Sequence, residues 1–257
     1  MGRASHNLEQ ATILVFSTRL TSAEIWPKVL EVEDTSSTDL ESGTINGDRS
    51  CFGSIALTID TRGGDSLMRK DIYYFEESGP ENTEQTIEIA YKRAKELDID
   101  QIVIASTHGQ TAHKVLDAFE NLESKIVVVT ISQAFGKEGW IMEEKVRQEL
   151  KKRGATVLTT LHALGDDVNT AFAPSDKAAA FNMVVARTLY RFSQGMKVCV
   201  EIVLMAAENG AIDVDREVIA IGGTGDGADT AVAIKPAYAR DFLNLEIREI
   251  LAKPRKA

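Results

Sequence analysis

The residues best suited to chemistry form a short polar turn, Ser106-Thr-His-Gly-Gln-Thr111, which follows the apolar stretch Gln101–Ala105. That stretch is typical of a strand, and the residues after the turn are typical of a helix to about Leu122. The free backbone N–H groups at such a helix start, with neighbouring hydroxyls, suit a phosphate oxyanion, and Gly109 would let the anion approach the main chain. Simple capping of the helix by a Ser or Thr side chain is the alternative. The candidate phosphate-binding residues here are Ser106, Thr107, His108, Gly109, Gln110 and Thr111.

A second candidate is the glycine-rich loop Gly222–Ala228, which follows the predicted strand Glu217–Ile221. Its glycines lack the GxGxxG spacing, and Thr230–Ile234 after it is typical of a strand rather than a helix, so a dinucleotide site is not indicated. We expect a hairpin that lines a pocket, with Asp226 and Asp229 able to accept hydrogen bonds from a ligand. A solvated hairpin tip is the alternative. The candidate ligand-binding residues in this region are Gly222, Gly223, Thr224, Gly225, Asp229 and Thr230.

Further polar residues stand near the other predicted strand ends. The loop Ser132–Gly139 is long enough to act as a lid, and its Lys137 could pair with an anion. His108 lies inside the candidate anion turn, whereas His162, next to apolar neighbours, is more typical of a packed histidine. Three more residues are expected to add polar contacts to the same ligand: Asn82, Thr83 and Thr130.

The sequence holds no motif that predicts a metal centre or a nucleophile. CxxC, HExxH, GxSxG and the Walker A pattern are all absent. The two cysteines, Cys51 and Cys199, do not make a disulfide framework, and Cys199 lies in an apolar stretch typical of a buried thiol. We therefore expect no metal, and a reducing cytoplasm as the location.

Alternating strand and helix patterns predict the fold that positions these loops. The predicted strands are Ile72–Phe75, Gln101–Ala105, Lys125–Thr130, Ala155–Thr159, Glu217–Ile221 and Thr230–Ile234, with a short last element at Leu245–Leu251. The predicted helices are Asn82–Leu97 (capped by Asn82 with Gln85), the one that ends near Leu122, Trp140–Arg153, Ser175–Phe192 (closed by Gly195) and Val198–Ala207. The β-branched residues of Val198–Ala207 are typical of a strand, but its length and the following Asn209-Gly210 favour a helix.

This alternation predicts an α/β fold: a three-layer, doubly wound, mostly parallel sheet with a C-terminal β-hairpin. In open sheets of this kind, ligands bind beyond the C-terminal ends of the strands. The three polar loops described above all follow predicted strands, so we expect them to meet at one edge of the sheet.

Composition excludes several functional classes. The chain has 257 residues, with 29 basic against 39 acidic ones and a formal net charge of −10. Sequence-independent binding to nucleic acid or to anionic lipid needs clustered Lys and Arg, so neither partner is expected. No apolar run approaches the roughly 18 residues of a membrane span.

The chain divides near residue 68. Residues 1–67 are rich in Ser and Thr and lack a sustained helical period, whereas residues 68–257 follow the α/β pattern. One hypothesis is that Met68 is the real start and that the upstream part is spurious. The other is a genuine extension that is poorly ordered or forms strands.

Two segments, Ile102–Ala112 and Lys125–Thr130, resemble the C-terminal α/β domain of pyruvate kinase, which carries a similar strand, turn and helix. In many pyruvate kinases that turn holds the phosphate of an allosteric sugar effector. The chain also resembles small stand-alone proteins of this domain type in Gly79–Thr83, Ser106–Ala112 and Ile221–Ala231. The resemblance covers about residues 70–253 and leaves residues 1–67 unmatched.

The resemblance implies a pocket for a phosphorylated small molecule, with flavin mononucleotide (FMN) as one candidate cofactor. The pyruvate kinase active site belongs to a separate barrel domain of about 200 residues or more, for which this chain has no room, so the resemblance implies the fold and not that activity. The chain departs from many relatives at His108-Gly109-Gln110, which leaves the identity of the ligand open.

Three functions are compatible with these observations. A ligand-binding module is favoured, because no obvious acid–base pair is visible. A small enzyme, either a phosphotransferase or an oxidoreductase, could use the phosphate as a handle, with His108, His162 or Lys137 as acid or base. The third is a subunit of a homo-oligomer, because pyruvate kinase C-terminal domains contact one another; the predicted helix Trp140–Arg153 is a candidate contact.

Overall fold

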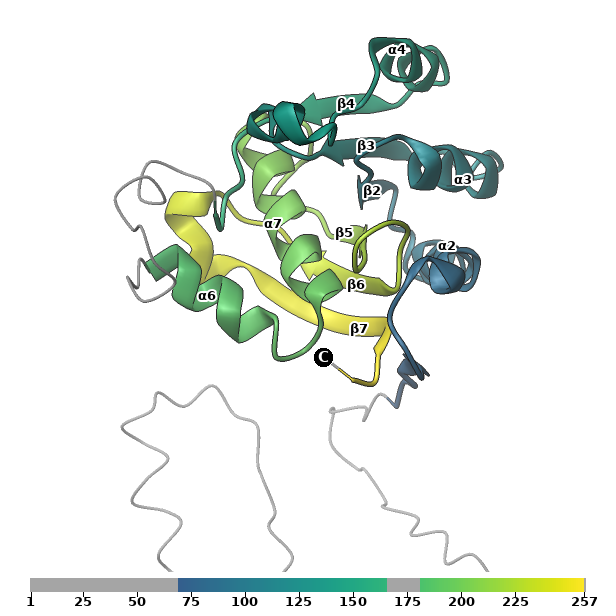
Figure 1. Ribbon diagram of the computed structural model, residues 1–257. Coiled ribbons are helices and arrows are strands. Elements are labelled where there is room, and N and C mark those ends of the chain that lie inside the picture. The colour runs from purple at the N-terminus through teal and green to yellow at the C-terminus, as the bar shows by residue number, and fades with distance from the viewer. Residues whose placement is uncertain (1–68, 166–180, 257) are drawn as a thin grey trace, which may run out of the picture. The chain divides into compact units, whose positions relative to one another are not determined.

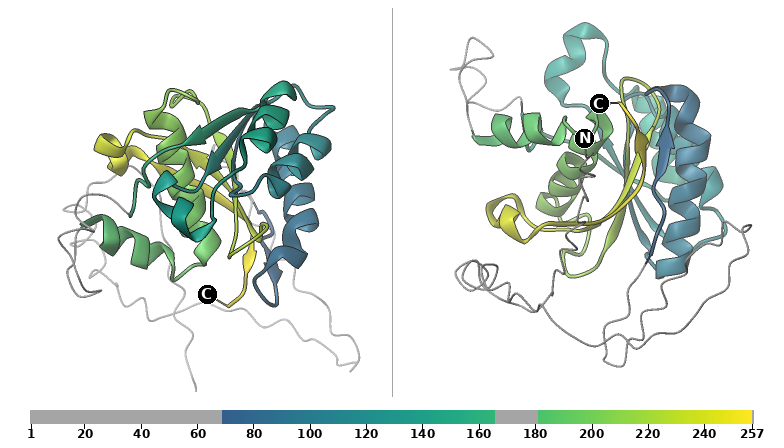
Figure 2. Two further views of the ribbon diagram at one scale, coloured as in Figure 1. Left: turned by 45° about the horizontal axis from the view of Figure 1, so that its top comes forward. Right: turned by 90° about the horizontal axis from the view of Figure 1, so that it is seen from below.

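The computed structural model describes residues 69–165 and 181–256, which belong to one compact unit. They form a seven-stranded sheet with helices on both faces (Figures 1 and 2). The predicted three-layer, mostly parallel α/β architecture is therefore confirmed. Residues 1–67, for which the sequence left two hypotheses, lie outside the described residues.

The sheet has the order β1-β7-β6-β5-β2-β3-β4. Its strands are β1 (Tyr73–Phe75), β2 (Gln101–Ala105), β3 (Lys125–Thr130), β4 (Thr156–Thr159), β5 (Val218–Gly222), β6 (Thr230–Lys235) and β7 (Glu246–Pro254). Strands β2 to β5 are mutually parallel, and β1 is parallel to β7. The β5–β6 and β6–β7 pairs are antiparallel, so the chain ends in the predicted hairpin.

Helices cover both faces of the sheet. The α-helices are α2 (Thr83–Leu97), α3 (Gln110–Ala118), α4 (Glu144–Lys152), α6 (Phe181–Leu189) and α7 (Gln194–Glu208). Short 3-10 helices are η2 (Pro80–Asn82), η3 (Gln133–Glu138) and η4 (Ala239–Asn244). Side chains alternate across each strand, so Ile102 and Ile104 pack with α2 and α3, while Val103 packs with α7 on the other face. This double burial explains why the central strands are apolar throughout.

Strand order reverses between β2 and β5. From β2 the chain crosses through α3 to β3 and through α4 to β4, then returns by α7 to β5 on the other side of β2. The covering helices change face at this return, with α3 and α4 on one face and α7 on the other. Such a switch point leaves a crevice at the C-terminal ends of the strands, where ligands bind in open α/β sheets.

Helix α7 begins earlier than the sequence analysis predicts. The predicted Ser175–Phe192 helix, said to close at Gly195, begins outside the described residues, and its described part is α6, which ends at Leu189. Gly195 is instead the second residue of α7, which Ser193 caps by accepting a hydrogen bond from the Met196 N–H at 2.9 Å. A Cβ on Gly195 would lie 2.2 Å from Thr230 Oγ1, so this glycine marks the close approach of α7 to β6 and not a helix stop.

Two other helix starts also differ from the prediction. Helix α4 begins at Glu144 and not at Trp140, because the preceding residues are used elsewhere: Met142 is buried in the core. The Asn82–Gln85 capping box does not form. Asn82 already has helical dihedral angles at the end of η2, and its side chain donates to the Glu77 carbonyl at 2.9 Å.

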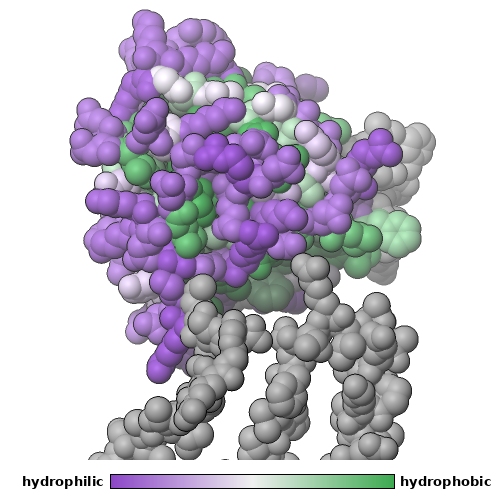
Figure 3. Space-filling view, turned by 180° about the vertical axis from the view of Figure 1, so that it is seen from behind, coloured by the Kyte–Doolittle hydropathy of each residue, from purple (hydrophilic) through white to green (hydrophobic). Residues whose placement is uncertain are grey.

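The last element, predicted as short, is the nine-residue strand β7, whose antiparallel pairing with β6 contains register shifts. Seen from behind, the surface of the unit is mostly hydrophilic with small apolar patches (Figure 3). In the described part of the chain, every helix is too short or too polar to cross a bilayer.

Candidate ligand-binding site

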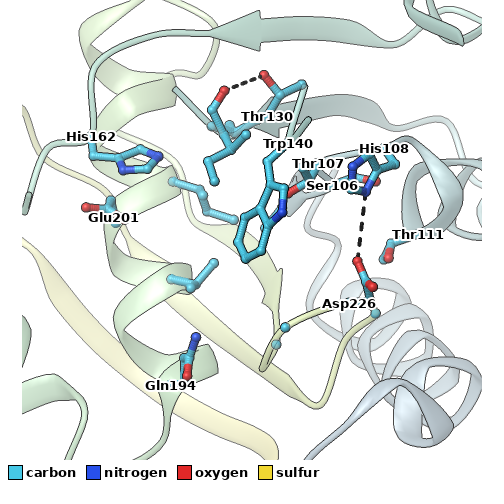
Figure 4. A pocket seen from close by; sticks show the side chains of 18 of the residues that line it. Ser106, Thr107, His108, Thr111, Thr130, Trp140, His162, Gln194, Glu201 and Asp226 are labelled. Carbon is cyan, nitrogen blue, oxygen red and sulfur yellow. Dashed lines mark hydrogen bonds and ion pairs between the residues drawn. The ribbon is translucent and has the colours of Figure 1, made fainter. Parts of the chain in front are cut away.

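A cavity of 370 Å³ opens at the C-terminal edge of the central strands. Its wall comes from the β2–α3 turn, the β3–α4 connection, the residues after β4, helix α7 and the β5–β6 loop (Figure 4). Both its position at the switch point and its volume are typical of small-molecule sites. The predicted meeting of the polar loops at one edge is therefore observed.

The structure brings about half of the predicted site residues to this cavity. Those that line it are Ser106, Thr107, His108, Gln110, Thr111, Thr130, Gly223 and Gly225. Those that do not are Asn82, Thr83, Gly109, Gly222, Thr224, Asp229 and Thr230.

The β2–α3 turn and the first residues of α3 form what we call the amide wall, residues 106–111. Within residues 69–165 and 181–256, no protein oxygen accepts a hydrogen bond from the backbone N–H groups of residues 107–111. The Ser106 hydroxyl, in contrast, accepts from the Ala112 N–H at 3.3 Å, so Ser106 acts as a local cap. The amide wall thus presents unused donors at the positive end of a helix dipole.

Thr111 adds a hydroxyl to the amide wall. It is 5% exposed, and no hydrogen bond joins its hydroxyl to another described residue. No fully buried side-chain oxygen in the described residues lacks a partner, so the Thr111 hydroxyl must be reached by solvent, and the cavity that it lines provides the access. An unpartnered hydroxyl beside free amides is a suitable ligand for an oxyanion.

Gly109 has a structural role beneath the amide wall. It is the N-cap of α3 with φ of +96°, and a Cβ there would lie 2.4 Å from Val146 Cγ1 of α4. Glycine is needed at this position because the backbone is left-handed and α4 packs directly against it.

The Gly79–Thr83 segment supports the glycine loop from behind. The Thr83 hydroxyl accepts from the Ala228 N–H at 2.9 Å, and the Gly79 N–H donates to Asp229 Oδ2 at 3.3 Å. Asp229 is fully buried, and its other oxygen accepts from the Thr230 hydroxyl at 2.8 Å. These side chains shape the β5–β6 loop and do not point into the cavity.

Asp226 is the loop carboxylate that faces the cavity. Its Oδ1 lies 3.9 Å from Nδ1 of His108, across the mouth between the glycine loop and the amide wall (Figure 4). On a third side, the Thr130 hydroxyl lies 2.6 Å from that of Thr159, which also accepts from Arg147 at 2.7 Å. These hydrogen bonds hold the ends of β3 and β4 together.

Helix α7 contributes charged residues that the sequence analysis missed. Lys197 Nζ lies 2.5 Å from Glu201 Oε2, and the two side chains are only 11% and 6% exposed. The other Glu201 oxygen accepts from the Leu164 N–H at 2.9 Å. Their four-residue spacing in an otherwise apolar helix is the signal that could have revealed this pair. We call Lys197, Glu201 and Gln194 the α7 wall, because all three line the cavity. Figure 4 shows Gln194 and Glu201 on α7, on the opposite side of the cavity from His108 and Thr111 of the amide wall.

Aromatic side chains lie between the two walls. Trp140 is 52% exposed and stands over the cavity, with His162 on the same side as Glu201 (Figure 4). Nε2 of His162 accepts from the Ser132 N–H at 3.3 Å, and its ring is 5.8 Å from the ring of Phe135. His162 is therefore packed, as predicted, although it also lines the cavity.

Cys199 contributes no chemistry to the site. The side chain is fully buried on the sheet side of α7, and this burial raises the pKa of its thiol. In the described ranges, no three His, Cys, Asp or Glu side chains gather as a metal would require.

Comparisons with known proteins found one matching protein family and similar solved structures. The sequence model of the pyruvate kinase alpha/beta domain matches residues 84–234, which is more than half of the chain. One similar solved structure is a pyruvate kinase from Cryptosporidium parvum, with 13% identity, a TM-score of 0.33 and coverage of 60% of this chain and 23% of that one. A second pyruvate kinase structure from that organism gives 14% identity, a TM-score of 0.30 and coverage of 59% and 22%. The chain thus spans about a quarter of the length of these enzymes. By the family-model match, it belongs to the family of the pyruvate kinase alpha/beta domain.

Proposed function

We propose that this chain is a small-molecule binding protein that seats the phosphate of its ligand on the amide wall. The observation that carries the proposal is the set of backbone N–H groups of residues 107–111, which have no protein acceptor in the described residues. All of these residues except Gly109 line the cavity. The solvent-reached hydroxyl of Thr111 adds a further donor. Anions bind helix N-termini of this kind because the donors converge and the helix dipole is positive there.

FMN is the ligand that we propose to test first. Trp140 offers a partly exposed indole face over the cavity, on which a flat ring could stack. Riboflavin carries the same ring without the phosphate and is the matched control. Purified protein with bound oxidised flavin would be yellow, with absorbance near 450 nm (an approximate value expected for the flavin ring).

The experiment measures the thermal shift of the full chain with inorganic phosphate, FMN and riboflavin. A ligand at a hundredfold excess over its Kd stabilises the folded state by about 2.7 kcal/mol. We expect shifts with phosphate and with FMN, and a much smaller one with riboflavin.

The variant Thr107→Val/Thr111→Val removes two hydroxyls from the amide wall while nearly conserving volume. We expect it to weaken phosphate binding at least about tenfold, which corresponds to the loss of one or two hydrogen bonds to a charged group. The matched control Thr107→Ser/Thr111→Ser keeps the hydroxyls and should bind as the wild type does. Equal phosphate binding by the Val and wild-type proteins would contradict the proposed seat.

A further inference from the structure

The α7 wall limits the chemistry of the far end of the ligand, by which we mean the end away from the phosphate on the amide wall. Lys197 donates to Glu201, which is its only acceptor in the described part of the chain, and its ammonium lies 6.0 Å from the centre of the Tyr190 ring. An ammonium has three donors, so Lys197 keeps donors for a ligand. Both oxygens of Glu201 already accept, from Lys197 and from Leu164. The α7 wall therefore offers donors but no net charge.

The other charged residues that line the cavity also bear on which ligands can bind. Among the described lining residues, Lys197 is the only Lys or Arg, and the carboxylates are Glu201 and Asp226. The formal charges of these three side chains sum to −1. The positive end of α3 can compensate one phosphate, but nothing at the α7 wall compensates a second anion. A second phosphate there would lose hydration with no net positive charge to replace it, because Lys197 is already paired with Glu201.

We propose that the Lys197–Glu201 pair is a specificity determinant that selects ligands with one phosphate and an uncharged, oxygen-bearing far end. A carbonyl or hydroxyl oxygen there would accept from Lys197, whereas a second phosphate would be rejected. This inference rests on the proposed seat at the amide wall. It adds that the seat takes a monophosphate and not a bisphosphate.

The test compares two probes that differ in one group, glucose 6-phosphate and glucose 1,6-bisphosphate, with inorganic phosphate as the reference. Isothermal titration of the full chain gives the three dissociation constants. We expect glucose 6-phosphate to bind at least about tenfold more tightly than the bisphosphate, since burying a second charge without compensation costs this much or more. Equal or tighter binding of the bisphosphate would overturn the inference, and so would failure of both sugars when inorganic phosphate binds.

Variants test whether charge is the cause. Glu201→Gln gives the α7 wall a positive charge, so we expect the preference for the monophosphate to fall to within about threefold. Lys197→Gln/Glu201→Gln restores zero net charge and should restore the preference. Glu149→Gln, on the exposed side of α4, makes the same change in total charge away from the cavity and should have no effect. A folded Glu201→Gln protein with an unchanged preference would contradict the inference.

The outcomes also separate the two proposals. Binding of phosphate and of both sugar phosphates with equal affinity leaves the seat intact and removes only the selectivity. Absence of binding by all three probes removes both proposals. If Glu201→Gln does not fold, as judged by circular dichroism, the wild-type comparison decides alone.

Discussion

The two walls of the cavity recognise ligands by different means. The amide wall offers backbone N–H groups of residues 107–111, whose directions are set by the turn from β2 into α3. The α7 wall offers a side-chain ion pair that is almost fully buried. Backbone donors depend on local geometry and tolerate many side chains, whereas a buried ion pair depends on both of its members. Substitutions should therefore act on the α7 wall mainly through single residues, and on the amide wall mainly through the backbone.

The largest effect is expected from Lys197→Met, which leaves the Glu201 carboxylate buried without its partner. Removal of one member of a buried pair costs about 3 kcal/mol or more of unfolding free energy. Urea unfolding monitored by circular dichroism measures this loss. The double variant Lys197→Met/Glu201→Gln removes the unpaired charge and should recover about half of it. A single variant as stable as the wild type would show that the pair is not a structural unit.

On the amide wall, the corresponding test is Gly109→Ala. We expect a loss of about 2 kcal/mol, because an L-residue is strained at φ of +96° and the new Cβ would clash with Val146. Gly154→Ala is the matched control, since its φ is +93° but no atom lies within 4 Å of the added Cβ. It should lose about 1 kcal/mol, from strain alone. Equal losses in the two variants would mean that the contact between α4 and the turn is not restrictive.

The smallest effect is expected at the Arg93–Glu96 ion pair, whose carboxylate is exposed, and which serves as a reference for the pair with two buried members. The hydrogen bond from Arg93 to Glu96, at 2.6 Å, holds the pKa of the Glu96 carboxyl below its ordinary value of 4.5. A lowered pKa in the folded state gives stability that is present above the ordinary value and is lost as the pH falls through the folded-state value. Wild-type and Glu96→Gln proteins should therefore differ slightly in urea midpoint at pH 7 and converge in acid. A difference that grew on acidification would contradict this sign.

The amide wall can be predicted from the sequence better than the α7 wall, for a physical reason. A strand, a small polar turn and a helix start are adjacent in sequence, so the Ser106–Thr111 turn could be recognised from local pattern. The Lys197–Glu201 pair becomes a cavity wall only because α7 crosses to the other face and returns to β5. The i, i+4 spacing of Lys197 and Glu201 can be seen in the sequence. Their burial, which marks the pair as part of a site, depends on tertiary contacts.

Because tertiary contacts are not visible in the local sequence, the roles predicted for Gly195 and Asp229 are wrong. The local pattern predicts a helix stop at Gly195, because the close approach of this glycine to Thr230 of β6 is a tertiary contact. The loop pattern also predicts that Asp229 contacts a ligand, as Asp226 does, because the sequence does not show which way each side chain of the loop points. Asp229 is buried against the Gly79 N–H, and Asp226 faces the cavity. Most strands and the order of the elements, in contrast, follow from the hydrophobic pattern of the sequence.

The most direct test of the phosphate seat is a ¹⁵N–¹H NMR titration of the full chain with inorganic phosphate. The amide signals of residues 107–111 should show the largest shifts, move in a saturable manner and return when phosphate is removed. Saturable shifts confined to another part of the chain, such as the start of α7 at Gln194, or no saturable shift at all, would contradict binding at the amide wall.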